Sequence, residues 1–221
     1  TILRAYARYL RQAGSTFSLA YVEQALAANA RVAALLVRLF FARFKDWTGE
    51  ARLVEEIEAA LDAVQNLDED RILRSFLAVM RATLRTNFFL DKPYLSFKLD
   101  PKGVPGLPEP RPMFEIWVYS PRVEAVHLRG DFVARGGIRW SDRMEDFRTE
   151  VLGLMKAQMV KNVVIVPVGA KGGFVLKRPP VGEREALMKE GIACYQTFLR
   201  GMLDITDNLV DGKVVPPKEV K

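Results

Sequence analysis

The hydrophobic pattern of the chain changes near residue 87, and this change constrains the fold more than any other feature. Before it, apolar residues recur with the period of helices. Small and polar residues at 14–16 and 48–50 break the pattern, and residues 31–44 (RVAALLVRLFFARF) are apolar enough to be buried among other helices. The sequence therefore predicts an all-helical region over residues 1–86, whose last helix spans 68–86.

Beyond that point the pattern is typical of a mixed α/β domain over residues 87–221. Some stretches alternate apolar and polar residues as strands do, and one short stretch is almost wholly apolar, as in strands covered on both faces. The expected elements are strands at 113–119, 123–128 and 163–168 and helices over 145–161 and 183–204. Ser141-Asp142 is the expected N-cap of the first helix, and a charged loop is expected after Asp211. The predicted fold class is α/β, with a helical region followed by an incomplete α/β domain.

Composition narrows the classes of function. The net charge is +6, but acids are interleaved with the bases, and no run of five or six lysines and arginines occurs, so nucleic acid is not an expected partner. The apolar runs are too short to span a bilayer, and no signal peptide is visible. The single cysteine, Cys194, falls in a helical pattern and is expected in the core. It cannot form an internal disulfide, which favours a cytoplasmic setting.

Two polar side chains emerge from the apolar face of the predicted helix 145–161. Gln158 and Lys161 share a stripe with apolar residues at helical spacing. The closest acid near that stripe is Glu150, which is roughly 16 Å from Lys161 along the helix axis, too far for an ion pair within the helix. Lys161 is thus expected either to bind an anion or simply to end the helix, where a positive charge interacts favourably with the helix dipole. Periodicity alone leaves both interpretations open.

Two further cations lie beside glycines. Lys171 lies in the sequence GAKGG, directly after the predicted strand at 163–168. Ligands of open α/β sheets bind beyond the carboxyl ends of strands, and glycines there let a ligand approach the backbone. A turn lysine that points into water fits this motif equally well. Arg135 precedes Gly136-Gly137, and its guanidinium suits a carboxylate. His127 has no second histidine or cysteine nearby, so we expect a structural histidine and no metal site. The enzymatic hypothesis requires Arg135, Lys161 and Lys171 to converge on one cleft.

A second hypothesis uses the helical region instead. Arg4, Arg8 and Arg11 lie on one stripe of the first predicted helix. They form either a solvated face or the docking surface of a non-enzymatic helical interaction module.

A long motif carries a family resemblance. The segment ARGGIRWSDRMEDFRTEVLGLMKAQMVKNVVIVPVGAKGGF closely resembles the substrate-binding segment of the large, NAD-specific glutamate dehydrogenases, over about residues 123–177. It also resembles, more loosely, the pattern KGG(I/L)R…QxxK…PxGGAKGG of the smaller glutamate dehydrogenases. Within residues 1–86, RAYARYLRQ is similar to the segment preceding that core in the large class.

The resemblance implies NAD-dependent oxidative deamination of L-glutamate to 2-oxoglutarate and ammonium, a step of amino-acid catabolism. Lys171 matches the catalytic lysine, and Gln158 and Lys161 match groups that bind the α-carboxylate. Arg135, beside Gly136, stands where the smaller enzymes place a lysine that binds the distal carboxylate. No GxGxxG follows a strand, and the family's catalytic aspartate is expected beyond Lys221. The chain is therefore expected to be an inactive fragment of a larger homo-oligomeric enzyme, whose NAD is bound by a domain not present here.

Overall fold

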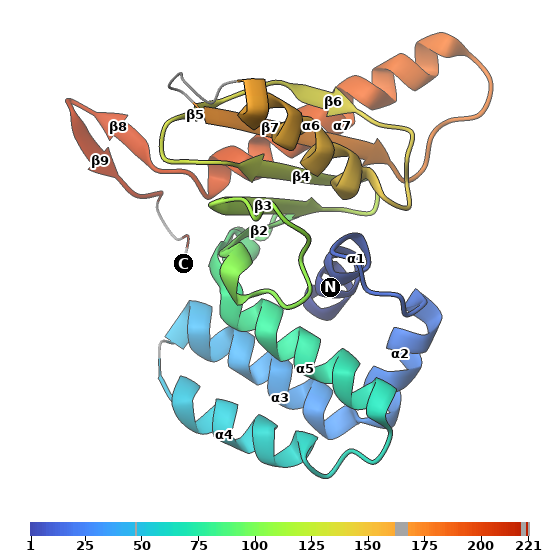
Figure 1. The fold of residues 1–221 in the computed structure, drawn as a ribbon, viewed down its shortest axis with the longest axis vertical. Helices are drawn as coiled ribbons and strands as arrows, with labels where there is room; N and C mark the ends of the chain where they lie inside the picture. The colour runs from blue at the N-terminus through green and yellow to red at the C-terminus, as the bar shows by residue number, and fades with distance from the viewer. Residues whose placement is uncertain (47, 162–167, 218–219, 221) are drawn as a thin grey trace. The chain divides into compact units, whose positions relative to one another are not determined.

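The computed structural model describes residues 1–46, 48–161, 168–217 and 220, which form two compact units (Figure 1). One unit comprises Thr1–Ala82 and Lys102–Leu107, and the other comprises Thr83–Pro101 and Pro108–Lys221. The first is helical and the second is a mixed sheet with helices, as the predicted α/β class requires.

The helical unit is built from amphipathic helices that bury their apolar stripes against one another. Its elements are α1 (Ile2–Gln12), α2 (Leu19–Ala28), α3 (Ala30–Phe41), the π-helical turn η1 (Ala42–Asp46), α4 (Glu50–Leu61) and α5 (Leu67–Ala82). The Ser18 hydroxyl caps α2 by accepting a hydrogen bond from the Tyr21 amide. The helix predicted over 68–86 ends earlier than expected, because residues 83–86 leave α5 to form an edge strand.

The apolar residues of α3 lie in the core of this unit. Leu36, Leu39 and Phe40 are fully buried, and the Phe40 ring meets that of Tyr6 edge to face. Among the described residues no single helix is long and apolar enough to cross a membrane. The segments Leu19–Ala28 and Ala30–Lys45 meet those limits only as a pair bent by 97°.

The second unit is built on a seven-stranded sheet. The strands are β1 (Thr83–Thr86), β2 (Leu95–Leu99), β3 (Phe114–Tyr119), β4 (Val123–Arg129), β5 (Ala134–Arg135), β6 (Ile138–Trp140) and β7 (Val168–Leu176). Their order is β1-β2-β3-β4-β7-β5, with β6 also paired to β7. The first four and β7 pair antiparallel, whereas β5 and β6 run parallel to β7. The remaining elements are η2 (Phe88–Leu90), η3 (Pro101–Gly103), α6 (Phe147–Lys161), α7 (Arg184–Asp204), β8 (Asn208–Val210) and β9 (Lys213–Val215).

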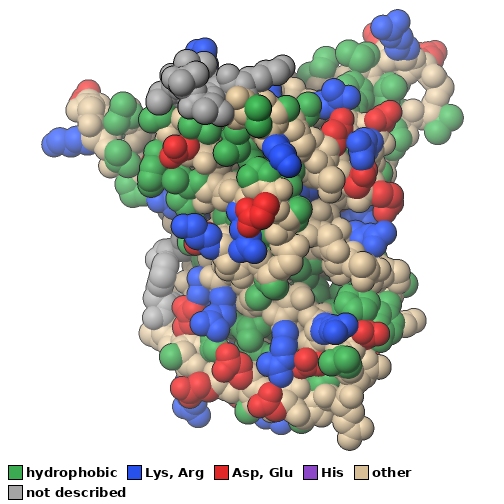
Figure 2. Space-filling model, in the orientation of Figure 1, with side chains coloured by type: hydrophobic (Ala, Val, Ile, Leu, Met, Phe, Trp, Pro, Cys, Tyr) green, Lys and Arg blue, Asp and Glu red, His purple; other side chains and the backbone are tan. Residues whose placement is uncertain are grey.

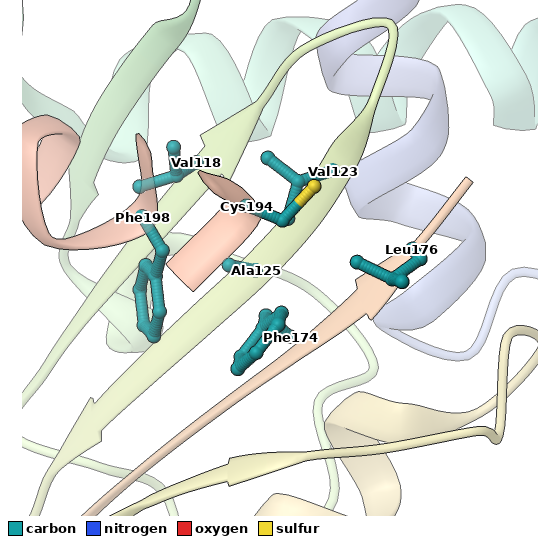
Figure 3. Close-up of a cluster of buried hydrophobic side chains, with 7 residues drawn as sticks. All are labelled: Val118, Val123, Ala125, Phe174, Leu176, Cys194 and Phe198. Carbon is teal, nitrogen blue, oxygen red and sulfur yellow. The ribbon is translucent and has the colours of Figure 1, made fainter. Parts of the chain in front are cut away.

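Helices cover the two faces of this sheet. A Cβ added at Gly173 would lie 2.4 Å from Cγ2 of Val151 in α6, whereas one added at Gly172 would lie 3.3 Å from the Phe198 ring in α7. Because neighbouring residues of a strand point to opposite faces, α6 and α7 lie on opposite sides of β7. Figure 3 shows Phe174, Leu176, Cys194 and Phe198 in the core between the sheet and α7.

Several predicted elements are confirmed. The strands expected at 113–119 and 123–128 are β3 and β4, and the helix expected over 183–204 is α7. Cys194 lies in the core, where burial raises the pKa of its thiol to about 12.

Other expectations are wrong. The GAKGG sequence is the middle of β7 and not a turn that follows a strand, because its backbone is paired on both sides. The predicted strand at 163–168 lies outside the described residues except for Val168, where β7 begins. Helix α6 begins at Phe147, so Ser141-Asp142 is not its N-cap, and the Ser141 hydroxyl accepts a hydrogen bond from the Arg143 amide instead.

The expected C-terminal loop is partly a hairpin. Strands β8 and β9 pair antiparallel around Asp211-Gly212, both of which have positive φ (49° and 75°). Such a turn matches the twist of paired strands, and an Asp-Gly pair between apolar residues is a known signal for it.

His127 lies on the α7 face of β4, as the predicted strand requires, and burial lowers the pKa of its imidazole to about 4, with a smaller contribution from Arg129. The unfolded chain would bind a proton near pH 6.5 that the folded chain rejects, so stability falls as the pH drops from 6.5 towards 4. We expect His127 to account for a loss of about 3 kcal/mol over that window.

Urea unfolding of the wild type and of His127→Gln at pH 7 and pH 4.5 measures this loss. The substitution should flatten the pH dependence, and equal declines in the two proteins would contradict the assignment to His127.

Candidate functional site

Lys171 lies in the middle of β7, on the face that α6 covers. It shares this face with Gly169 and Gly173, because side chains alternate along a strand. A Cβ on either glycine would lie against α6, 3.1 Å from the Gln158 side chain or 2.4 Å from that of Val151. The Lys171 side chain is half-buried. It therefore projects from a sheet surface whose neighbouring positions on the same strand have no side chain.

Arg135 lies on the same face of the sheet. In the parallel pairing of β5 and β6 with β7, Arg135 is opposite Gly169 and Arg139 is opposite Gly173. Arg139 does face α6, since its Nε lies 2.6 Å from a carboxylate oxygen of Glu150 in that helix. Paired positions share a face, which places the exposed Arg135 on the α6 side, two residues along the register from Lys171.

Gly136 permits a close approach of two backbones. A Cβ at this position would lie 1.5 Å from the carbonyl oxygen of Ala170 and 3.3 Å from Oε1 of Gln158. The overlapping atom belongs to the backbone of a strand paired with β4, so it cannot move aside as the end of a flexible side chain would. Any side chain at 136 would therefore separate the β5–β6 connection from β7.

Gln158 joins α6 to this backbone. Its Nε2 donates to the carbonyl oxygen of Arg135 at 3.1 Å. Its Oε1 is buried and has no hydrogen-bond partner among the described residues. A buried amide oxygen without a partner costs free energy, so this atom is available to a donor that enters the site.

Two acids near the start of α6 are already paired. Glu150 binds Arg139 and accepts a hydrogen bond from the Ser141 hydroxyl at 2.5 Å, and Asp146 forms an ion pair with Arg143. Arg139 and Arg143 are thus each held by an acid. Neither acid neutralises Lys171 or Arg135 through an ion pair.

The structure thus brings four sequence-predicted residues together: Arg135, Gly136, Gln158 and Lys171. The fifth, Lys161, is the last residue of α6, one helical turn beyond Gln158, and its side chain lies outside the described part of the structure. No group of three or more histidine, cysteine or acidic side chains in the described residues is arranged to hold a metal ion.

Sequence reasoning missed a buried ion pair that holds α6 in place. Both carboxylate oxygens of Glu115 in β3 accept hydrogen bonds from Arg148 at 2.7 Å, and both side chains are essentially inaccessible to solvent. The sequence contained two signals of this pair. Glu115 occupies an inward position of the strand MFEIWVY, and Arg148 follows Phe147, which is fully buried. A charged side chain buried at such a position needs a partner of opposite charge, because an unpaired buried charge is strongly destabilising.

We expect Gly136→Ala to lower the free energy of unfolding by about 1–3 kcal/mol, because the new methyl group would overlap the Ala170 carbonyl. The matched control is Gly137→Ala, since nothing lies within 4 Å of a Cβ built there. Thermal unfolding of the two variants measures the difference. Equal stability of both would contradict the close approach at Gly136.

The fold and the site define a class of protein, an α/β domain that presents a lysine, an arginine and an amide on one face of its sheet, as an anion-binding site requires. Comparison with known proteins makes this more specific. Residues 56–221 match the family described as bacterial NAD-glutamate dehydrogenase, catalytic domain, and residues 1–46 match glutamate dehydrogenase, helical motif 3. The chain belongs to the bacterial NAD-glutamate dehydrogenase family, which confirms the resemblance drawn from its sequence.

Curated relatives agree with this assignment. Over 99% of its length the chain is 57% identical to an NAD-specific glutamate dehydrogenase of Pseudomonas aeruginosa and 55% identical to one of Halomonas elongata. It is 50% identical, again over 99% of its length, to one of Mycobacterium tuberculosis. The chain spans 14%, 14% and 15% of the length of these relatives, respectively.

Proposed function

We propose that residues 1–221 contribute the substrate-binding part of an NAD-dependent glutamate dehydrogenase, which converts L-glutamate, NAD⁺ and water to 2-oxoglutarate, ammonium, NADH and a proton. The observation that carries the proposal is the placement of Arg135, Gln158 and Lys171 on the α6 face of the sheet, in a chain of this family. A dicarboxylate substrate complements two cations that no described acid neutralises through an ion pair.

Each residue has a proposed role. Lys171 is the catalytic residue, whose Nζ moves protons to and from the water that attacks the iminium carbon and stabilises the carbinolamine that forms. Gln158 and Lys161 bind the α-carboxylate. Arg135 binds the distal carboxylate, for which a guanidinium offers two parallel hydrogen bonds. Gly136 supports this arrangement by letting the β5–β6 connection approach β7.

One unit of the described residues can be compared with a dinucleotide-binding fold. Strand β6, helix α6 and strand β7 form a strand–helix–strand unit, but its first turn, residues 141–146, contains no glycine to admit a pyrophosphate close to the backbone. We infer that NAD⁺, which would accept the hydride, is held by another part of a longer protein. Residues 1–221 alone are expected not to reduce NAD.

Further expectations about the whole protein stay proposals. A lone, buried cysteine supports a cytoplasmic location. Lysines and arginines lie among acids over the face seen in Figure 2, which supports the expectation that nucleic acid is not a partner. Homo-oligomerisation and a role in amino-acid catabolism also remain proposals.

The interaction-module hypothesis is not favoured by the family match. It relied on an arginine stripe in α1, yet Arg11 of this stripe donates a hydrogen bond to the carbonyl oxygen of Ser15 at 3.2 Å and so helps to hold the turn after the helix.

Calorimetry with 2-oxoglutarate tests the proposal. We expect Lys161→Ala and Lys171→Ala each to weaken binding by about 10- to 100-fold, because each removes a charge-assisted contact. Lys189→Ala, at an exposed position of α7, is the control. Equal affinity in the wild type, Lys161→Ala and Lys171→Ala would overturn the assigned roles.

A further inference from the structure

A pocket opens on the opposite face of the sheet from Lys171. Its volume is about 420 Å³, within the usual range for small-molecule sites. Strands β2, β3 and β4 contribute Lys98, Ile116 and His127, which are paired with one another and with Gly172 on the α7 face. The end of α7 and the residues after it close the other side.

Lys98 brings into this pocket a charge that has no ion-pair partner among the described residues. Its side chain is partly buried, its Nζ lies 4.5 Å from the centre of the Phe114 ring, and no carboxylate among the described residues forms an ion pair with it. Burial lowers the pKa of Lys98, the nearby Arg85 and Arg129 lower it further, and Asp207 opposes this shift in part. The amino group is therefore held in surroundings that favour the approach of an anion.

The neighbouring acid relieves Lys98 only in part. Asp207, an acid that lines the pocket, is bound by Arg85 at 2.6 Å. Arg129 donates to the carbonyl oxygens of Asp131 and Phe132, which are neutral acceptors. Two cations that line the pocket, Lys98 and Arg129, thus face one carboxylate that is already paired.

The rest of the lining is mostly apolar. Phe114, Ile116, Met202 and Ile205 contribute apolar side chains to the lining, and the Phe114 ring lies against the Lys98 amino group. His127, whose pKa is lowered to about 4, is neutral near pH 7 and adds no charge. A pocket with one available ammonium group and an apolar wall complements a monoanion that carries a hydrophobic body, and offers little to a polyphosphate or a sugar.

We propose that this pocket is a second ligand site for a small aliphatic or aromatic monocarboxylate, with the carboxylate on Lys98 and the apolar body against Phe114, Ile116 and Met202. The site is separate from that of the proposed dehydrogenase reaction. Lys171 and Gln158 lie on the α6 face of the sheet, whereas Lys98 and His127 lie on the α7 face.

Calorimetric titration of the 221-residue chain with phenylacetate tests the proposal. Lys98→Met should weaken binding by at least about tenfold, because it removes the ammonium group assigned to the carboxylate and nearly preserves the length of the side chain. The uncharged phenylacetamide should bind the wild type more weakly than phenylacetate does, by a similar factor. Met202→Trp, which fills the apolar part of the pocket and leaves Lys98 in place, should also weaken binding and serves if Lys98→Met fails to fold.

Two controls separate this site from the proposed active site. Lys189→Met, at an exposed position of α7, and Lys171→Met, on the opposite face of the sheet, should both retain the wild-type affinity for phenylacetate. Equal affinity of Lys98→Met and the wild type would overturn the proposal. A loss of binding in Lys171→Met would also overturn it, since the acid would then occupy the α6 face. Failure of 2-oxoglutarate to bind, with phenylacetate binding as expected, would affect only the proposed dehydrogenase function.

Discussion

Replacing Lys171 by methionine in the longer protein should lower kcat for glutamate oxidation by about 10²- to 10⁴-fold, the usual contribution of a positioned acid or base. Methionine has nearly the same length but carries neither a charge nor a transferable proton. The backbone should tolerate the change, because Lys171 is half-buried in a strand that is paired on both sides. NADH formation at saturating glutamate measures the effect.

Lys171→Arg separates charge from proton transfer. Arginine keeps the positive charge but does not give up its proton near neutral pH, so it should restore substrate binding more than kcat. Lys189→Met is the matched surface control and should leave kcat unchanged. A kcat for Lys171→Met within twofold of the wild type would exclude Lys171 as the catalytic residue.

Arg148→Ala should destabilise the protein by about 3–5 kcal/mol, because it leaves the Glu115 carboxylate buried without its partner. Glu115 is completely inaccessible to solvent, and Arg148 is 1% exposed. A loss of this size is a large part of the stability of a typical domain, so the variant is expected to unfold partly at 37 °C. Urea denaturation followed by circular dichroism measures it.

Two comparisons identify burial as the cause. Arg143→Ala removes an exposed ion pair with Asp146 and should cost less than about 1 kcal/mol. The double variant Glu115→Leu/Arg148→Met, which removes both charges and keeps apolar volume, should be more stable than Arg148→Ala. If Arg148→Ala were as mild as Arg143→Ala, the ion pair would not stabilise the position of α6 on the sheet.

Hydrophobic periodicity predicted correctly those helices and strands in which the pattern of the sequence agrees with the burial that packing imposes. The alternation of β3 and β4 and the helical pattern of α7 appear in the structure with boundaries close to those expected. The helix expected over 145–161 is present as α6 but begins at Phe147, because the Ser141 hydroxyl accepts its hydrogen bond from Arg143 before the helix starts. The hairpin at Asp211-Gly212 was not predicted, although the Asp-Gly pair is a local turn signal. Glu115 and Arg148 were missed as well, since they are far apart in the sequence and recognisable as partners only once β3 and α6 are packed together.

The GAKGG segment shows the limit of local reasoning most clearly. Its glycines favour a turn when considered alone. In the folded chain they lie in a central strand, because β4 pairs along one edge of β7 and β5 and β6 pair along the other, and because α6 leaves no room for a side chain at Gly173. The requirement for glycine at this position comes from tertiary packing and not from a turn.

The division into helical and α/β regions, the family and the candidate residues could all be read from the amino-acid sequence, because they depend on periodicity and on a long motif. The sequence did not reveal that Lys171 shares a face with Gln158 and Arg135, or that Lys98 and His127 lie on the other face. These placements depend on strand register. Side chains alternate with a period of two, so a shift of one residue in the pairing of β7 would have placed Lys171 on the α7 side.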